Sequence, residues 1–173
     1  MRVIGPKNLG QTLTEWALHE GRGRGRGAEA LDALPPSQGR FHAACFLLEN
    51  RRNVVAAILA AEPLDSLIIE VRPEDVPRIN TMGALPLERF SANMLAAHDA
   101  DGSGDWVRQL VAGGDVVGPF VAVARRPEGP LTLFDGLHRA AAWVGHANAG
   151  RRYPILVDVV ITARAAPYFE LAP

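Results

Sequence analysis

The most constraining feature of this 173-residue chain is the segment Leu131–Ala142, where an apolar run, an Asp-Gly pair and an alanine-rich run follow one another. The run Leu131–Phe134 is typical of a buried strand, and Leu137–His146 is rich in the strong helix former alanine. Gly136 stands between them, where a sharp turn needs backbone angles that glycine adopts at little cost. A strand that passes through one glycine into a helix predicts an α/β fold.

The segments on both sides of this unit continue the alternation of strands and helices. Further strands are expected at Ser66–Val71, Phe120–Arg125 and Tyr153–Ile161, and helices at Pro73–Ile79, Pro86–Ala97 and Asp105–Ala112. The turn Pro127–Pro130 joins two of the strands, and Gly129 is free to take positive φ there. The aromatic rings of Trp106 and Trp143 are expected in the core, with Trp143 facing the sheet.

Residues 1–66 are expected to form an N-terminal helical extension, and residues 67–173 the α/β domain. Within the extension, Gln11–Glu20 has apolar side chains at helical spacing. Gly21–Gly27 alternates glycine and arginine, which disfavours a helix and predicts a flexible loop. The strongly apolar segment Phe41–Ala61 predicts one broken helix or two that pack on the core.

Composition excludes several classes of protein. Hydrophobic residues make up 48% and charged residues 21%, which argues against global disorder. The formal net charge of −1 gives no overall attraction to nucleic acid or to an acidic membrane. Cys45 is the only cysteine, so an internal disulfide and a multi-cysteine zinc site are excluded. Lys7 is the only lysine, so it is the single candidate for any mechanism that needs one.

Two further observations concern location and known motifs. No apolar run reaches the roughly 18 residues that cross a bilayer, and the first residues lack the apolar stretch of a signal peptide. We therefore expect a cytoplasmic protein with no membrane partner. The sequence has no P-loop pattern, no Gly-x-Ser-x-Gly elbow and no His-x-x-x-His pair.

Partners other than a small molecule have weaker support. Arg22, Arg24 and Arg26 alternate with glycine, and such segments bind nucleic-acid backbone. A solvated linker is the favoured interpretation, because the run is short and lacks aromatic residues. The segment Phe41–Leu48 offers a homodimer contact as the alternative to packing on the sheet.

The residues that carry chemistry stand at the predicted strand-to-helix turn. Free N–H groups at the start of a helix attract anions, and His138 and Arg139 fall in its first turn, where a bound phosphate would meet them. The Asp135 carboxylate is suited to hold a magnesium ion or to accept the proton of an acceptor hydroxyl group. The structural alternative is equally open: Asp135 caps the helix, Gly136 serves the turn, and Arg139 pairs with a surface acid. The other histidines, His19, His42, His98 and His146, have less support as catalytic groups.

The block from Leu67 to Val159 resembles the ParB/sulfiredoxin-like superfamily. The matching pieces are Ile68–Val76, Gly118–Val123, the signature Phe134–Ala142 and the strand after Tyr153–Ile155, in the order of that superfamily. The resemblance covers a little over half of the chain. It implies a small mixed sheet with helices packed around it and a nucleotide or phosphate site at the signature turn.

The branches of this superfamily differ at the signature. Sulfiredoxins carry a catalytic cysteine where this sequence has Leu137, so sulfiredoxin activity is not expected. Chromosome-segregation ParB proteins carry a different signature and a helix-turn-helix domain. The free-serine kinases are the most similar branch, with Asp-Gly-x-His-Arg. Their signature implies that Gly136, Leu137, His138 and Arg139 hold the phosphates of ATP or ADP, and that Asp135 aids the transfer, with Mg²⁺.

These kinases also use a glutamate just after the first strand and short helix, a position that reads Asn80 here. An asparagine is no general base, so Glu74 and Glu88, which flank it, are the alternative catalytic carboxylates.

Three hypotheses follow. The first is a nucleotide-dependent phosphotransferase acting on a small hydroxyl-bearing molecule, with an acceptor pocket in 81–118. The second is a ParB-like nuclease or nucleic-acid-binding protein. The third is a non-catalytic nucleotide sensor.

Overall fold

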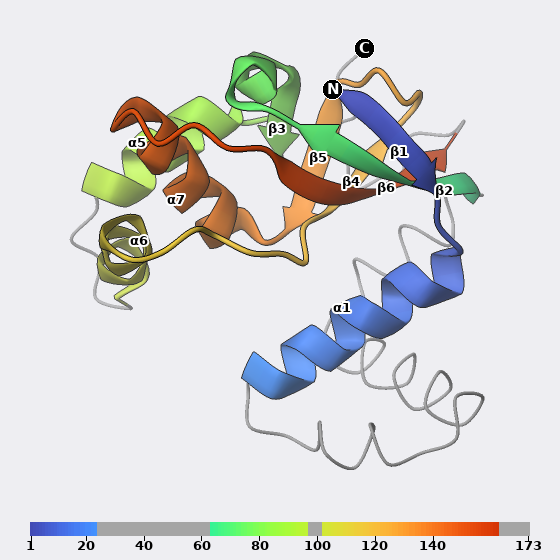
Figure 1. Ribbon diagram of the computed structural model, residues 1–173, viewed down its shortest axis with the longest axis horizontal. Helices are drawn as coiled ribbons and strands as arrows, with labels where there is room; N and C mark the ends of the chain where they lie inside the picture. Colours follow the sequence, from blue (N-terminus) through green and yellow to red (C-terminus); the bar gives the residue numbers. More distant parts are fainter. Residues whose placement is uncertain (24–62, 97–101, 163–173) are drawn as a thin grey trace.

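The computed structural model describes residues 1–23, 63–96 and 102–162, and its centre is a mixed sheet of six strands (Figure 1). The strands are β1 (Arg2–Pro6), β2 (Pro63–Val71), β3 (Ile79–Thr81), β4 (Val121–Ala124), β5 (Leu131–Asp135) and β6 (Ile155–Thr162). Their order across the sheet is β1-β2-β6-β4-β5-β3. The expected α/β class is confirmed.

The sheet contains both antiparallel and parallel pairs of strands. The pairs β1–β2, β2–β6 and β4–β5 are antiparallel, whereas β6–β4 and β5–β3 are parallel. The C-terminal ends of β3 and β5 therefore lie at one end of the sheet's strands, and β4 and β6 begin at this same end. Ligands of α/β proteins commonly bind beyond the carboxyl ends of parallel strands.

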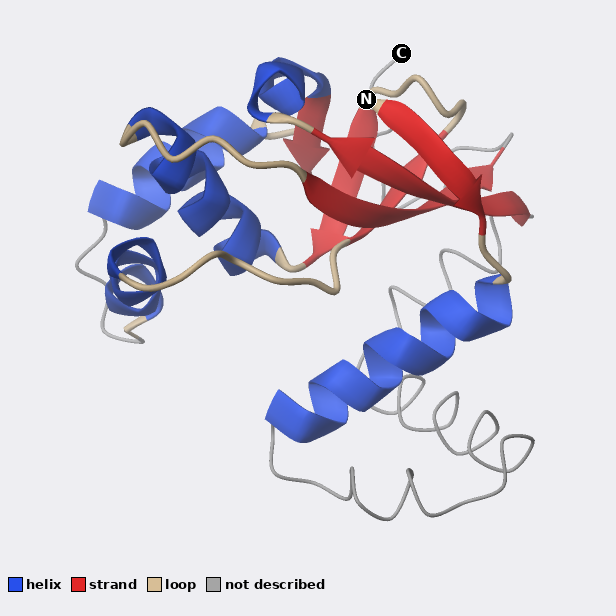
Figure 2. Ribbon diagram, in the orientation of Figure 1, coloured by secondary structure: helices blue, strands red, loops and turns tan. Residues whose placement is uncertain are grey.

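Three helices cover one face of the sheet: α5 (Leu87–Ala96), α6 (Ser103–Ala112) and α7 (Leu137–Asn148) (Figure 2). α7 is the central one, and every residue from Ala140 to His146 is buried. Its small alanines let the helix approach the strands closely, and Trp143 is fully buried as expected. Leu131 and Leu133 of β5 share one hydrophobic cluster with these alanines.

The other face of the sheet carries helix α1 (Leu9–Gly23) (Figure 1). Because side chains alternate along a strand, Phe134 points away from α7, and its ring meets Trp16 of α1 edge-on with 5.4 Å between centroids. The hydroxyl groups of Thr12 and Ser66 lie 3.1 Å apart and join α1 to β2. Burial of Trp16, which is 1% exposed, holds α1 on this face.

Most of the expected elements are present with bounds shifted by a few residues. Pro73–Arg78 is a 3-10 helix, η1, and its N-terminal proline and acidic residues fit that position. Gly129 has φ +79 in the turn between β4 and β5, as expected. β1 and β3 were not expected. β3 is only three residues long and has no periodicity to detect, and β1 lies at an exposed edge with a bulge between Val3 and Gly5.

The N-terminal part differs from the expectation in two ways. β1 belongs to the same sheet as the rest, and the expected boundary at residues 66 and 67 falls inside β2. α1 continues to Gly23, so the first residues of the expected flexible loop are helical. The rest of that loop, Cys45, and the apolar segment Phe41–Ala61 lie outside the described residues, as do His42 and His98. In the part of the chain that is described, no helix is long and apolar enough to cross a membrane.

Candidate functional site

The turn between β5 and α7 brings together the residues of the expected site. Asp135 ends β5 and is 8% exposed. Gly136 follows with φ +78 and ψ +19, in the left-handed region, and its carbonyl accepts a hydrogen bond of 2.8 Å from the Ala140 amide. The first turn of α7 therefore starts immediately after the strand. Its leading N–H groups point back along the helix axis toward the sheet edge.

Gly136 is required for close approach as well as for its backbone angles. A Cβ atom at this position would lie 2.8 Å from Cδ1 of Phe120 and 3.0 Å from the Pro119 carbonyl oxygen. Both distances are shorter than normal van der Waals contact. The segment before β4 thus packs directly on the turn and fixes its position.

Arg139 ties this turn to its surroundings. Its Nη2 donates to the Pro119 carbonyl at 2.7 Å and lies 3.5 Å from the Asp135 carboxylate. Its Nη1 contacts Nε2 of His19, and its guanidinium lies 5.7 Å from the centroid of the Phe120 ring. Because arginine only donates, Nε2 of His19 is the acceptor. A pairing of Arg139 with a surface acid was expected; the acid beside it is instead the buried Asp135.

The side chain of His138 takes a different direction. Its ring lies 5.2 Å from the ring of Trp106 on α6 and 6.4 Å from that of Phe90 on α5. His138 and Arg139 were expected to face a phosphate together, but their side chains have separate neighbours on two sides of the turn. Trp106 was expected in the core, and it is 45% exposed. An aromatic face is thus open beside the first turn of α7.

The two alternative carboxylates lie in the elements before and after β3. Glu74 in η1 is exposed and pairs with Arg152 at 2.6 Å, and this hydrogen bond is the main cause that lowers its pKa. Asn80 is half-buried in β3 beside Thr132 of β5. Glu88 is exposed in the first turn of α5, which follows the loop leaving β3. Topology therefore places Glu88 beyond the C-terminal end of β3, at the same end of the sheet as the signature turn.

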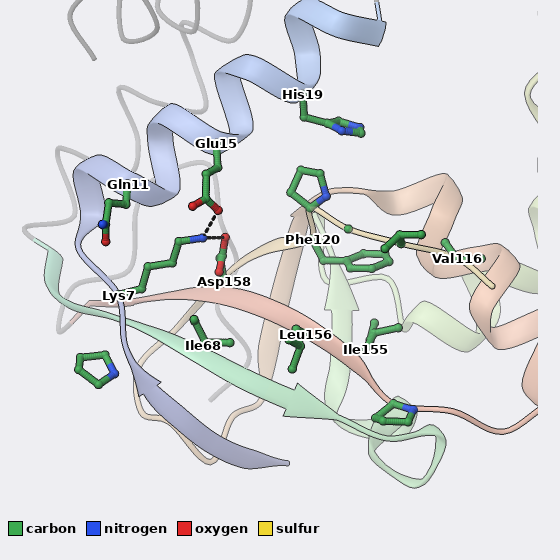
Figure 3. Close-up of a pocket in the computed structure, with 15 residues that line it drawn as sticks. Lys7, Gln11, Glu15, His19, Ile68, Val116, Phe120, Ile155, Leu156 and Asp158 are labelled. Atoms are coloured by element: carbon green, nitrogen blue, oxygen red, sulfur yellow. Dashed lines mark hydrogen bonds and ion pairs between the residues drawn. The ribbon is translucent and has the colours of Figure 1, made fainter. Parts of the chain in front are cut away.

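A cleft of about 850 Å³, which Pro119 also lines, opens between α1 and Phe120 (Figure 3). α1 forms one wall, and the segment 116–120 with the start of β6 forms the other. The polar lining groups are Lys7, Gln11, Glu15, His19 and Asp158, and the apolar ones include Val116, Val117, Pro119, Phe120, Ile155 and Leu156. The contact between His19 and Arg139 joins this cleft to the signature turn.

One end of the cleft holds a cluster of charges. Nζ of Lys7 lies 2.6 Å from a carboxylate oxygen of Asp158 and 2.5 Å from one of Glu15. Burial raises the pKa of Asp158 and outweighs the opposing effect of Lys7. Burial alone would lower the pKa of Lys7, but hydrogen bonds to both carboxylates raise it. Lys7 thus stays protonated, and its chemistry is that of a cation and not of an amine nucleophile.

The cleft was not expected from the sequence, although one pattern in it indicates a buried charge at this place. Asp158 is the only charged residue in the strand Ile155–Thr162, which is otherwise almost entirely apolar. A carboxylate in such a strand needs a partner. Gln11, Glu15 and His19 recur every four residues, so they share one face of a helix. The partner, Lys7, lies 151 residues from Asp158, and only the fold brings them together.

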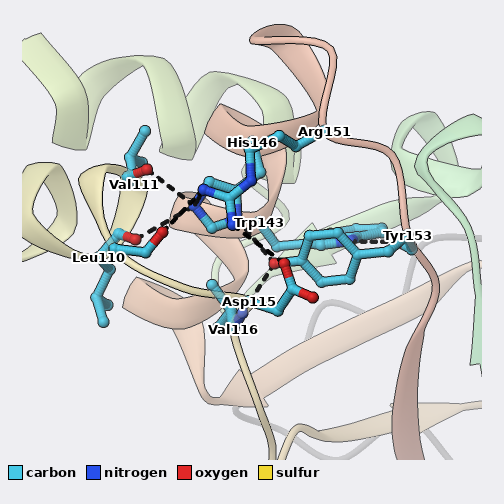
Figure 4. Close-up of polar contacts among 9 residues, drawn as sticks. Leu110, Val111, Asp115, Val116, Trp143, His146, Arg151 and Tyr153 are labelled. Carbon is cyan, nitrogen blue, oxygen red and sulfur yellow. Dashed lines mark hydrogen bonds and ion pairs between the residues drawn. The ribbon is translucent and has the colours of Figure 1, made fainter.

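A hydrogen-bond network behind α7 holds the wall of the cleft in place (Figure 4). His146 is fully buried, with Nδ1 2.7 Å from the Tyr153 hydroxyl and Nε2 3.0 Å from the Val111 carbonyl. The Tyr153 hydroxyl also accepts from the Val116 amide at 2.8 Å. Tyr153 therefore donates to Nδ1, and Nε2 of His146 carries the proton. His146 is a structural residue that anchors the start of the segment 116–120.

Comparison with known proteins adds no assignment: no family model, curated protein or solved structure matches this chain. Within residues 1–23, 63–96 and 102–162, no group of three or more His, Cys, Asp or Glu side chains is arranged to hold a metal ion.

Proposed function

We propose that this protein is a nucleotide-dependent phosphotransferase that acts on a small hydroxyl-bearing molecule and binds the nucleotide phosphates at Asp135–Arg139. The observation that carries the proposal is the junction of β5 with α7. The helix starts at a left-handed glycine directly after the strand, beside the C-terminal end of the parallel neighbour β3. Helix N-termini at such edges favour anions through N–H groups and the helix dipole.

The surroundings of the turn give each group a role. The first N–H groups of α7, at Leu137 and His138, would face the phosphate oxygens, and Arg139 supplies positive charge nearby. The half-exposed ring of Trp106 offers a stacking surface for a nucleobase, because every base has a π face. Phosphoryl transfer depends mainly on position and electrostatics, which a rigid turn supplies.

Asp135 is the residue suited to Mg²⁺. Magnesium sites in such enzymes use one or two carboxylates together with substrate phosphates, and Asp135 stands at the turn where those phosphates would bind. The ion would neutralise charge on the transferred phosphoryl group. When no ion is bound, the Asp135 carboxylate would instead orient the hydroxyl group of the acceptor. Glu88 is the better placed of the two alternative carboxylates, since Glu74 is paired with Arg152.

Calorimetry tests the binding step. ATP, ADP and CTP would be titrated, with and without Mg²⁺, into the wild type, His138→Ala and the control Arg125→Ala, which changes an exposed residue at the far end of β4. The proposal expects that His138→Ala weakens binding, because it removes the ring that lies beside Trp106, the surface offered to the nucleobase, and that Arg125→Ala leaves binding unchanged. Absence of binding for all three nucleotides would overturn it.

A non-catalytic nucleotide-binding protein is the second candidate. The observation that favours it is the lack of a free carboxylate at the Asn80 position together with the ion pair that occupies Glu74. Turnover in a screen of hydroxyl-bearing acceptors separates the two functions. Nucleotide binding with no transfer to any acceptor, and with no effect of Glu88→Gln, would favour the sensor.

A further inference from the structure

We propose that the cleft between α1 and the segment 116–120 binds a small organic cation, a primary ammonium with a short apolar chain. This site is separate from the phosphate-binding turn, and the proposal does not rest on the proposed function. The observation that carries it is the balance of charge at one end of a cavity whose other end is lined mainly by apolar side chains.

The charged end has more carboxylates than cations. Among the lining groups described, Lys7 is the only cation, and it is shared between Glu15 and Asp158. Nε2 of His19 accepts a hydrogen bond from Arg139, so this nitrogen already has a partner at the signature turn. The cluster of Lys7, Glu15 and Asp158 carries one net negative charge when both acids are ionised. A phosphate or carboxylate ligand would meet two like charges here, whereas an ammonium group would complete the balance.

Burial makes this balance matter. The side chains of Lys7 and Asp158 are 10% and 12% exposed, so their charges are poorly screened by water. Asp158 has two carboxylate oxygens, and Lys7 bonds to one of them. Glu15 is 59% exposed at the mouth, and Lys7 bonds to its Oε2, which leaves the other carboxylate oxygen to meet an incoming cation. A ligand ammonium, with three N–H donors, fits between these two acids.

The apolar part of the lining determines which chain the ammonium group of the ligand carries. Phe120, Ile155 and Leu156 present apolar atoms along the cleft, and Val117 is 78% exposed at its mouth. Val117 and Leu156, which is 56% exposed, gain most from contact with an alkyl or aryl group, because Phe120 and Ile155 are already buried. The cavity volume of about 850 Å³ falls within the range of small-molecule pockets. The chemistry that matches both ends is a primary amine that carries a short alkyl or arylalkyl chain.

The test uses n-butylamine, with n-butanol and butyrate as probes of the same length that differ in charge. Binding to the full chain is followed by NMR titration of backbone amides. The proposal expects butylamine to shift the amides around Lys7 and Asp158, and neither other probe to do so. Binding of butyrate in preference to butylamine, or of no probe, would overturn it.

Variants locate the binding. Loss of a charge-assisted hydrogen bond predicts that Asp158→Asn weakens butylamine binding about tenfold or more. The control Glu128→Gln, an exposed acid beyond β4, should change nothing. Should Asp158→Asn fail to fold, Glu15→Lys remains, since Glu15 is largely exposed. It should abolish butylamine binding and favour butyrate. Unchanged butylamine affinity in Glu15→Lys would contradict the proposal.

Discussion

Replacement of Gly136 by alanine tests whether the signature turn depends on both the backbone angle and the close approach of its neighbours. An alanine at φ +78 would occupy the left-handed region, which costs an L-residue about 1–2 kcal/mol. Its Cβ would also lie 2.8 Å from the ring of Phe120 and 3.0 Å from the Pro119 carbonyl oxygen. A backbone carbonyl and a buried ring cannot move aside freely. Overpacking of this kind costs about 1–3 kcal/mol.

Gly150 provides a matched control at the other end of α7. It has φ +86, but a Cβ atom there would meet nothing within 4 Å. Both substitutions also reduce the entropy of the unfolded chain, which stabilises the protein by about 0.4–1 kcal/mol. We therefore expect Gly150→Ala to lower the free energy of unfolding by about 1 kcal/mol or less, and Gly136→Ala by about 2–4 kcal/mol.

Urea denaturation followed by tryptophan fluorescence measures both values. With a slope of about 2 kcal/mol per molar urea, Gly136→Ala should move the midpoint by about 1–2 M. The comparison between the two variants isolates the steric part, because the backbone strain is shared. Equal losses of stability in Gly136→Ala and Gly150→Ala would refute the argument that Phe120 and Pro119 confine the turn.

Three further predictions follow from the described contacts. Tyr153→Phe should lower the free energy of unfolding by about 1–3 kcal/mol in urea denaturation, because it leaves Nδ1 of buried His146 without its donor. Trp143→Phe should cost about 1 kcal/mol more than Trp16→Phe, since only the Trp143 indole N–H has a hydrogen-bond partner among the described residues. Butylamine affinity should fall as pH falls, and the fall should begin above the usual aspartate range near pH 4, because burial raises the pKa of Asp158. A titration at several pH values checks the last, and affinity independent of pH would contradict it.

The sequence predicted the fold class and the central strand–turn–helix because these depend on local patterns. The alternating apolar residues of Leu131–Asp135, the glycine and the alanine run each specify their own conformation. The same locality explains what was missed. β3 has three residues and exists through its pairing with β5. The exposure of Trp106 depends on how α6 sits beside α7, which no window of sequence encodes.

The candidate site shows the same division. The sequence predicted that Asp135, Gly136, His138 and Arg139 share one turn, because they are neighbours in the chain. The direction of each side chain could not be predicted, because it depends on contacts distant in the sequence. Arg139 contacts the Pro119 carbonyl and His19, and the His138 ring lies beside Trp106. The cleft was missed altogether, because its walls come from α1 and from segments 116–120 and 154–158, which are far apart in the sequence.

The turn and the cleft share one structural element, the segment that ends at Phe120. The Pro119 carbonyl is held by Arg139 on the side of the turn, and the Pro119 ring lines the cleft on the other. The network of His146 and Tyr153 anchors the same segment at Val116. A substitution that loosens Val116 should therefore disturb both places.

The most direct test of the central claim is an NMR titration of the ¹⁵N-labelled protein with ATP and Mg²⁺. The account predicts that the largest shifts occur at the amides of Gly136, Leu137, His138 and Arg139, and that the side-chain indole signal of Trp106 moves with them. Shifts confined to other parts of the chain, or no shifts at millimolar ATP, would contradict a phosphate site at the start of α7.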